Sequence, residues 1–88
     1  MSKLVDCFRE NVESILTIKR MTRVELSERL GTSKSYVSQV LNGRHDPSMQ
    51  VVEEFSQALR IRDPRDLLAE RTQHEWSGIL SGGKKRSK

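Results

Sequence analysis

The sequence contains few of the residues that build disulfide-bonded, metal-bound or membrane-embedded proteins. Its 88 residues include one cysteine, Cys7, and two histidines, which excludes a disulfide framework and a multi-cysteine metal site within the chain. A lone thiol fits a reducing compartment, so we expect a cytoplasmic protein. No apolar run approaches the roughly 18 residues that a membrane-spanning helix needs.

Aromatic residues are also scarce, at 5% of the chain, whereas charged residues reach 32%. This balance is typical of one small helical domain with a modest core, to which a partner chain would add stability. Acids are missing from residues 76–88, whose four basic side chains hold the whole net charge of +4. We therefore predict a folded domain over 1–76 and a flexible, disordered basic tail over 77–88.

Apolar residues recur at spacings of three and four, which predicts an all-α fold of five helices. Leu4 and Phe8 begin one such stripe, and Met49 and Phe55 belong to another. The predicted helices span about 3–19, 22–30, 33–41, 48–59 and 64–74.

Local stop and start signals join the second and third of these helices closely. Thr22 and Glu25 have the spacing of a capping box, and Gly31 suits a left-handed helix end. Ser33 or Thr32 then caps the next helix. Two helices joined by so short a turn form the helix-turn-helix motif, whose second helix can enter the major groove of DNA.

Polar residues with hydrogen-bonding groups occupy the outer face of the helix at 33–41. Gln39 can pair with adenine, Lys34 can donate to guanine, and Ser35 suits either base. Ser38 shares this face, so all four are predicted to read bases. The alternative is an ordinary solvated face. For the DNA backbone we predict contacts from Thr22, Arg23, Ser33, Tyr36, Asn42 and Arg44. Tyr36 fits equally well as a residue that packs inside the protein.

A small apolar group follows the fifth predicted helix. Trp76 either covers the end of the protein's own core or contacts a second copy of the chain. Because aromatic residues are enriched at interfaces and the core is small, we favour the dimer. The predicted dimer contacts are Leu68, Trp76, Ile79 and Leu80.

Residues from Val12 to about Leu59 resemble the phage repressor and Cro family of helix-turn-helix proteins. The residues that carry this resemblance are Met21-Thr22, Leu26-Ser27, Leu30-Gly31-Thr32-Ser33, Val37-Ser38, Asn42-Gly43-Arg44 and Pro47-Ser48. The resemblance implies a compact five-helix repressor-like domain of bacterial or phage origin. It also implies base readout by Lys34, Ser35 and Gln39, and phosphate contacts by Asn42, Arg44 and the start of the second helix. The chain departs from the family at Arg23, where Gln is common, and at Arg60, where a Gly commonly ends the fourth helix.

Two functions of different classes follow. The first is a homodimeric transcriptional regulator, usually a repressor, that reads an inverted repeat in double-stranded DNA. The second is an antitoxin or adaptor whose main ligand is a protein such as a toxin, with DNA binding for autoregulation. The sequence shows no convergent catalytic set and no ligand cluster, so we expect no enzyme activity, no cofactor, no metal and no membrane association.

Overall fold

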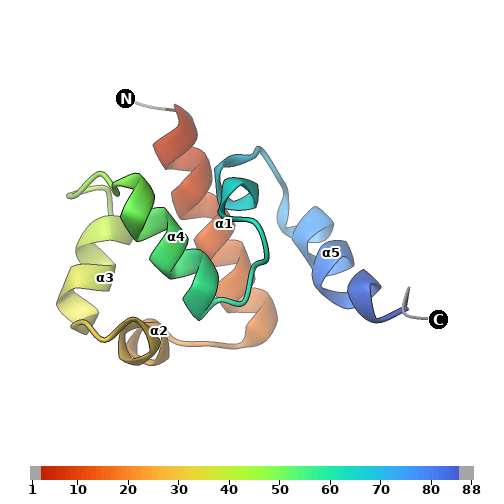
Figure 1. Ribbon diagram of the computed structural model, residues 1–88, viewed down its shortest axis with the longest axis horizontal. Coiled ribbons are helices and arrows are strands. Elements are labelled where there is room, and N and C mark those ends of the chain that lie inside the picture. The colour runs from red at the N-terminus through yellow and green to blue at the C-terminus, as the bar shows by residue number, and fades with distance from the viewer. Residues whose placement is uncertain (1–2, 86–88) are drawn as a thin grey trace.

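Five α-helices and one 3-10 helix follow one another in the computed structural model, which describes residues 3–85 (Figure 1). They are α1 (Lys3–Lys19), α2 (Arg23–Leu30), α3 (Lys34–Leu41), α4 (Met49–Ala58), the 3-10 helix η1 (Pro64–Leu68) and α5 (Gln73–Lys85). Residues 3–85 contain no strand, which confirms the predicted all-α class. None of the helices in this range has the length and apolar content of a membrane span.

The core lies where the inner faces of α1 to α4 meet η1 and α5. Phe8 of α1 and Phe55 of α4 pack edge to face, with ring centroids 5.2 Å apart. Most of the predicted apolar stripes are buried around this pair. Leu4 and Met49 are exceptions, with 56% and 55% of their surface exposed, because each lies in the first turn of its helix, at the edge of the core.

The predicted junction between α2 and α3 is confirmed in detail. The Glu25 amide donates to Thr22 Oγ1 at 3.1 Å, and the Thr22 amide donates to Glu25 Oε1 at 2.9 Å, which completes the capping box. Gly31 has a φ of 73°, in the left-handed region that a side chain disfavours. Ser33 Oγ accepts a hydrogen bond from the Tyr36 amide at 3.1 Å and so caps α3.

The predicted helix over 64–74 is wrong, because two separate elements occupy this stretch. The 3-10 helix η1 ends at Leu68, and Ala69 after it is extended. A second capping box then starts α5: the Glu75 amide donates to Thr72 Oγ1 at 3.1 Å, and the Thr72 amide donates to Glu75 Oε1 at 2.8 Å. Helix α5 runs through the predicted domain boundary at residue 76 and continues to Lys85. Residues 86–88 of the predicted tail lie outside the described residues.

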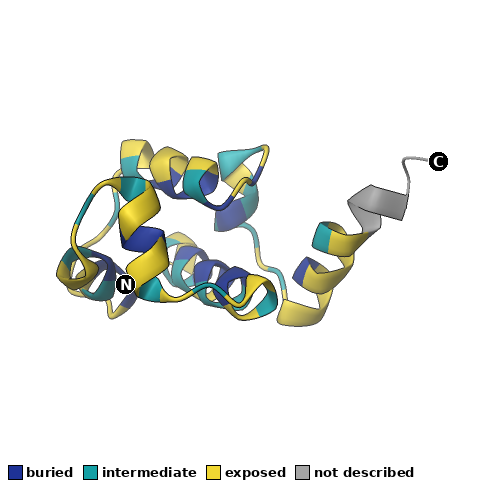
Figure 2. Cartoon of the chain, turned by 90° about the horizontal axis from the view of Figure 1, so that it is seen from below, coloured by how far each residue is buried: buried dark blue, intermediate teal, exposed yellow. Residues whose placement is uncertain are grey.

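One buried amide anchors α5 to the rest of the protein. Asn11 Nδ2 donates to the carbonyl oxygens of Leu67 and Ala69 at 2.8 and 2.7 Å, and Trp76 Nε1 donates to Asn11 Oδ1 at 2.7 Å. Trp76 is the one buried residue of α5 among those with described side chains (Figure 2), and its exposed fraction is 0%. The preferred interpretation of Trp76 as a dimer contact is therefore corrected: this residue completes the core of its own chain.

The two glycines Gly31 and Gly78 allow a matched test of the left-handed turn. An added Cβ would meet no atom within 4 Å at either position, but only Gly31 has a positive φ. We expect Gly31→Ala to lower the free energy of unfolding by about 1 kcal/mol, and Gly78→Ala, within a helix, to raise it by up to about 1 kcal/mol. Equal effects in chemical denaturation would show that the turn does not require a left-handed residue.

The Asn11 contacts predict a large penalty for an apolar replacement of similar size. Asn11→Leu leaves the Trp76 indole N–H and the Leu67 and Ala69 carbonyls without partners, at about 1–3 kcal/mol each. We expect a loss of at least about 3 kcal/mol in urea unfolding followed by the fluorescence of Trp76. Thr17→Val is the control, since its exposed hydroxyl bonds only to Glu13 of the same helix. A loss near that of the control would contradict the anchoring role.

Candidate nucleic-acid interface

The predicted base-reading residues lie together on the outer face of α3. Lys34, Ser35 and Gln39 are exposed and Ser38 is half-buried, whereas the opposite face is buried in the core through Val37, Val40 and Leu41. None of the four outer side chains has a hydrogen-bond or ion-pair partner among the described residues. Their donors and acceptors are therefore free for groups outside the protein.

The start of α2 offers backbone amides beside this face. The first-turn amides of Arg23 and Val24 have no partner within the helix, and they lie at its positive end. The hydroxyls of Thr22 and Ser33, both predicted to touch the DNA backbone, are exposed but already serve as caps. In this region the amides are thus the freer phosphate donors.

The guanidinium group of Arg23 is tied to another helix. Its Nη2 forms an ion pair with Glu13 Oε2 of α1, and the side chain is 31% exposed. A DNA phosphate must therefore share Arg23 with Glu13 or displace it. The sequence did not reveal this pair, because the two residues meet only when α1 and α2 pack.

The turn after α3 forms the other edge of the candidate interface. Asn42 and Arg44 are exposed, as predicted for phosphate contacts, and Gly43 between them has a φ of 84°. The Arg9 guanidinium carbon would lie 3.6 Å from a Cβ at Gly43, so α1 covers this turn with a cation. Arg9 also pairs with Asp6, at 2.6 Å. No local motif marks Arg9, and sequence reasoning missed it.

Tyr36 was predicted either to contact the DNA backbone or to pack inside the protein, and its position is compatible with both. Its side chain is half-buried against the core, and its ring centroid is 6.3 Å from that of His45 in the turn after α3. The ring therefore packs partly on the core beside this turn, and the rest of it is exposed.

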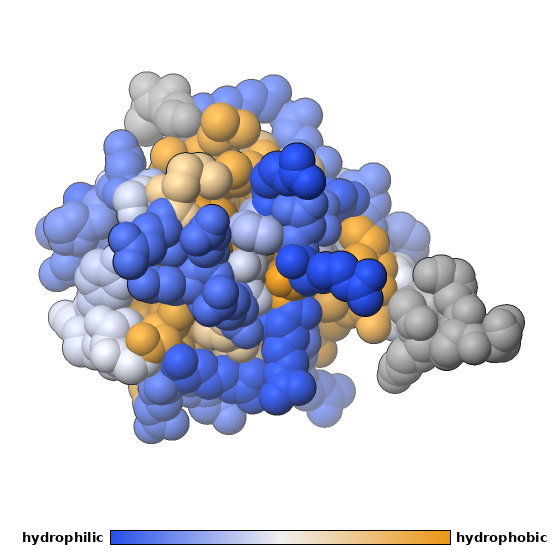
Figure 3. Space-filling model, viewed as in Figure 1, coloured by the Kyte–Doolittle hydropathy of each residue, from blue (hydrophilic) through white to orange (hydrophobic). Residues whose placement is uncertain are grey.

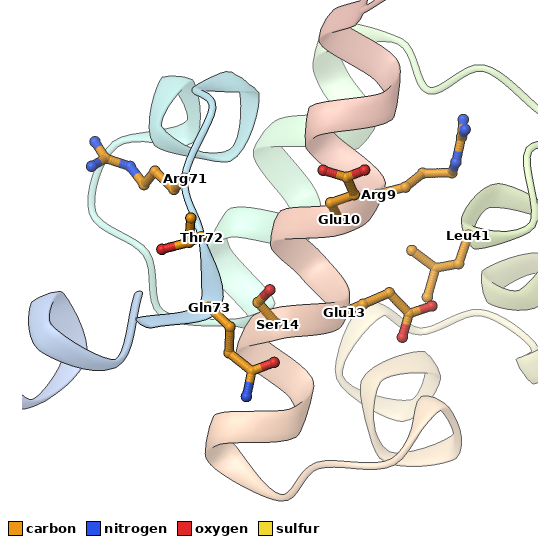
Figure 4. A pocket seen from close by; sticks show the side chains of 8 residues that line it. All are labelled: Arg9, Glu10, Glu13, Ser14, Leu41, Arg71, Thr72 and Gln73. Atoms are coloured by element: carbon orange, nitrogen blue, oxygen red, sulfur yellow. The ribbon is translucent and has the colours of Figure 1, made fainter. Parts of the chain in front are cut away.

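A groove of about 480 Å³ is lined mainly by side chains of α1 and of residues 71–73. Figure 4 shows its lining side chains on α1, on α3 and on the segment 71–73, where they do not converge on one point. Three of its charged groups already have partners: Arg9 with Asp6, Glu13 with Arg23, and Arg71 with Asp66. It offers no assembled catalytic or ligand-binding set.

Metal and thiol chemistry find no more support in the described residues. No group of three or more potential metal ligands occurs among them. Cys7 is buried, and this burial, followed by the nearby carboxylates of Glu70 and Glu10, raises the pKa of its thiol. Such a thiol is less ionised, and so a weaker nucleophile, than an exposed cysteine.

The surface formed by α3, the start of α2 and the turn 42–45 agrees with a comparison with known protein families. A family model described as helix-turn-helix matches residues 14–67, which is more than half of the chain. The match includes α2, α3 and α4, and it ends before α5. Comparisons with curated proteins and with solved structures found no match. The chain therefore belongs to the helix-turn-helix family of the Cro and C1 type, and it is a DNA-binding transcriptional regulator.

Proposed function

We propose that this regulator is a homodimeric repressor, which reads an inverted-repeat operator through α3 and blocks an overlapping promoter in the cytoplasm. The observation that carries the proposal is the outer face of α3: exposed side chains rich in hydrogen-bonding groups, without partners inside the described protein. A helix face serving only stability would usually carry stronger helix formers than serine.

Each outer residue suits a particular contact. Gln39 pairs bidentately with adenine, Lys34 donates to guanine near the N-terminus of the helix, and Ser35 bonds to either base. Ser38 is half-buried and makes a secondary contact. The α2 amides, with Arg23, and the turn residues Asn42 and Arg44 bind phosphates on the two sides of α3.

Dimerisation would place two α3 helices in successive major grooves, about 34 Å apart. We assign the dimer contact to Ile79 of α5, which is 44% exposed, together with the half-buried Leu80 and Leu68. These three apolar residues, which lie outside the family match, would serve a protein partner if the chain is an antitoxin or adaptor.

Selection from a random double-stranded DNA library at near-physiological salt tests the proposal. Enrichment of an inverted repeat would support a dimeric operator-binding protein. Enrichment of a single half-site would retain sequence readout but remove the dimer. A bound pool without any preferred sequence would contradict the proposed function and leave the protein-partner alternative.

The division between base and phosphate contacts gives opposite signatures for two variants. We expect Gln39→Ala to cost about 1–3 kcal/mol on the selected site and to relax preference at one base pair. Arg44→Ala should weaken binding to every sequence and flatten the dependence of affinity on salt. Titrations of a selected and a scrambled duplex at several salt concentrations measure both effects. Uniform losses from both variants would contradict the assignment of Gln39.

The dimer contact can be tested with two exposed apolar residues on different helices. Ile79→Asp should abolish the binding of two protomers to the operator, because a carboxylate would be buried in the contact. Leu4→Asp on α1 is the control and should leave the stoichiometry at two. Sedimentation of a labelled operator with increasing protein measures the result. An unchanged stoichiometry for Ile79→Asp would place the dimer contact elsewhere.

A further inference from the structure

The basic side chains of this protein divide sharply into paired and unpaired groups. Twelve of them precede the basic residues of 84–88, and five form ion pairs: Lys3, Arg9, Arg23, Arg65 and Arg71. Among the described residues, the unpaired ones are Lys34, Arg44, Lys19, Arg20, Arg29, Arg60 and Arg62. Lys34 and Arg44 belong to the proposed DNA-reading surface, so the other five need a separate explanation.

Four of these unpaired cations lie where three helices end. Lys19 and Arg20 close α1, Arg29 is in the last turn of α2, and Arg60 follows α4. Arg29 Nη1 donates to the Ala58 carbonyl oxygen at 3.2 Å, which ties the end of α2 to that of α4. Burial, followed by the charges of Arg29 and Arg60, lowers the pKa of Lys19, as expected for neighbouring cations. We call Lys19, Arg20, Arg29 and Arg60 the basic end.

The basic end follows one edge of the molecule. In Figure 1 the ends of α1 and α4 lie with α2 along the lower edge, and α2 lies between α3 and the end of α1. Figure 3 shows hydrophilic side chains along the same edge. Helix α2 thus lies between α3 and the end of α1 that carries Lys19 and Arg20.

Backbone strain provides a second, independent observation. Among the described residues, the only non-glycine residues with positive φ are Arg20, at 56°, and Arg60, at 62°. The chain uses glycine for the same region of φ at Gly31 and Gly43. The hydrogen bonds that close α1 and α4 put these two residues in this conformation, in which arginine is less favourable than glycine.

The bland explanation is the favourable interaction of a cation with the negative end of a helix. It applies to Lys19 and Arg29, which are in last turns. It does not explain why three helix ends bring like charges within range of one another without an acidic partner. It also leaves unexplained why two of these cations occupy backbone positions suited to glycine.

We propose that the basic end binds the phosphates of DNA that flanks the operator half-site, outside the base pairs read by α3. Arg20 is two residues before Thr22, the cap of α2, so the cluster extends the phosphate contact proposed for the start of that helix. Guanidinium groups match phosphate oxygens with two parallel hydrogen bonds. This inference rests on the proposed DNA-binding function, because it lengthens the DNA segment that each protomer contacts.

The test compares a duplex limited to the operator with one extended by a helical turn at each end. In the full chain, Arg20→Gly with Arg60→Gly removes two charges and both unfavourable φ values. We expect this variant to melt at a higher temperature than the wild type and yet bind the extended duplex about tenfold more weakly. Its log–log salt slope on that duplex should be smaller by roughly two. Binding to the operator-only duplex should change little.

Two further variants separate charge from strain and from net charge. Lys19→Gln with Arg29→Gln removes two charges of the basic end without changing a positive-φ residue, so weaker binding should appear without the higher melting temperature. Lys3→Gln with Arg65→Gln removes two ion-paired charges elsewhere and should leave the length dependence intact. An equal loss from this control would overturn the proposal, because net charge alone would then explain the effect.

Unchanged binding of both basic-end variants to the extended duplex would also overturn the proposal. An acidic segment of a protein would then be the alternative ligand of the basic end. This result differs from a failure of the proposed function. Phosphate contacts do not depend on sequence, so the salt slopes can be compared on a long duplex of arbitrary sequence even without a preferred site. Loss of operator preference and loss of the flanking contact are thus separate results.

Discussion

The left-handed turn at Gly31 is the constraint on which the DNA-reading surface depends. Helices α2 and α3 have eight residues each, too few to be stable alone. The turn satisfies carbonyls at the end of α2, since the Gly31 amide donates to Glu28 and the Thr32 amide to Ser27. With Leu26 and Val37 fully buried on the inner faces, the backbone sets the angle of α3. The outer side chains of α3 then make no hydrogen bond or ion pair with the rest of the described protein, and they are available for base contacts.

Much of this arrangement could be predicted from the sequence because its determinants are local. The cap at Thr22, the turn at Gly31 and the cap at Ser33 each act within about four residues. The local sequence is therefore enough to predict where α2 and α3 begin and end. The same capping pattern recurs at Thr72 and Glu75. It is present in the sequence, but the prediction of one helix over 64–74 did not use it. An apparently continuous helix after Pro64 concealed the start of α5.

Contacts between distant parts of the chain could not be predicted in the same way. Asn11 meets Leu67, Ala69 and Trp76 only after α1, η1 and α5 assemble, and no local pattern marks a buried asparagine in an amphipathic helix. Arg23 with Glu13 is a similar case at the candidate site. The interpretation of Trp76 turned on this difference, because a sequence shows that an indole is present but not whether its N–H has a partner inside the chain.

The net charge of the folded part does not reveal which of its basic side chains are unpaired and able to contact DNA. Residues 1–75 carry no net charge, but ion pairs engage five of their twelve basic side chains and five of their twelve acidic ones. Among the described residues before position 76, the unpaired basic side chains belong to α3, the turn after it, the ends of α1, α2 and α4, and Arg62. Arginine at the two left-handed positions is less favourable for stability than glycine would be. A fold this small has a small free energy of unfolding. The Asn11 contacts that anchor α5 raise it, and arginine in place of glycine at positions 20 and 60 lowers it.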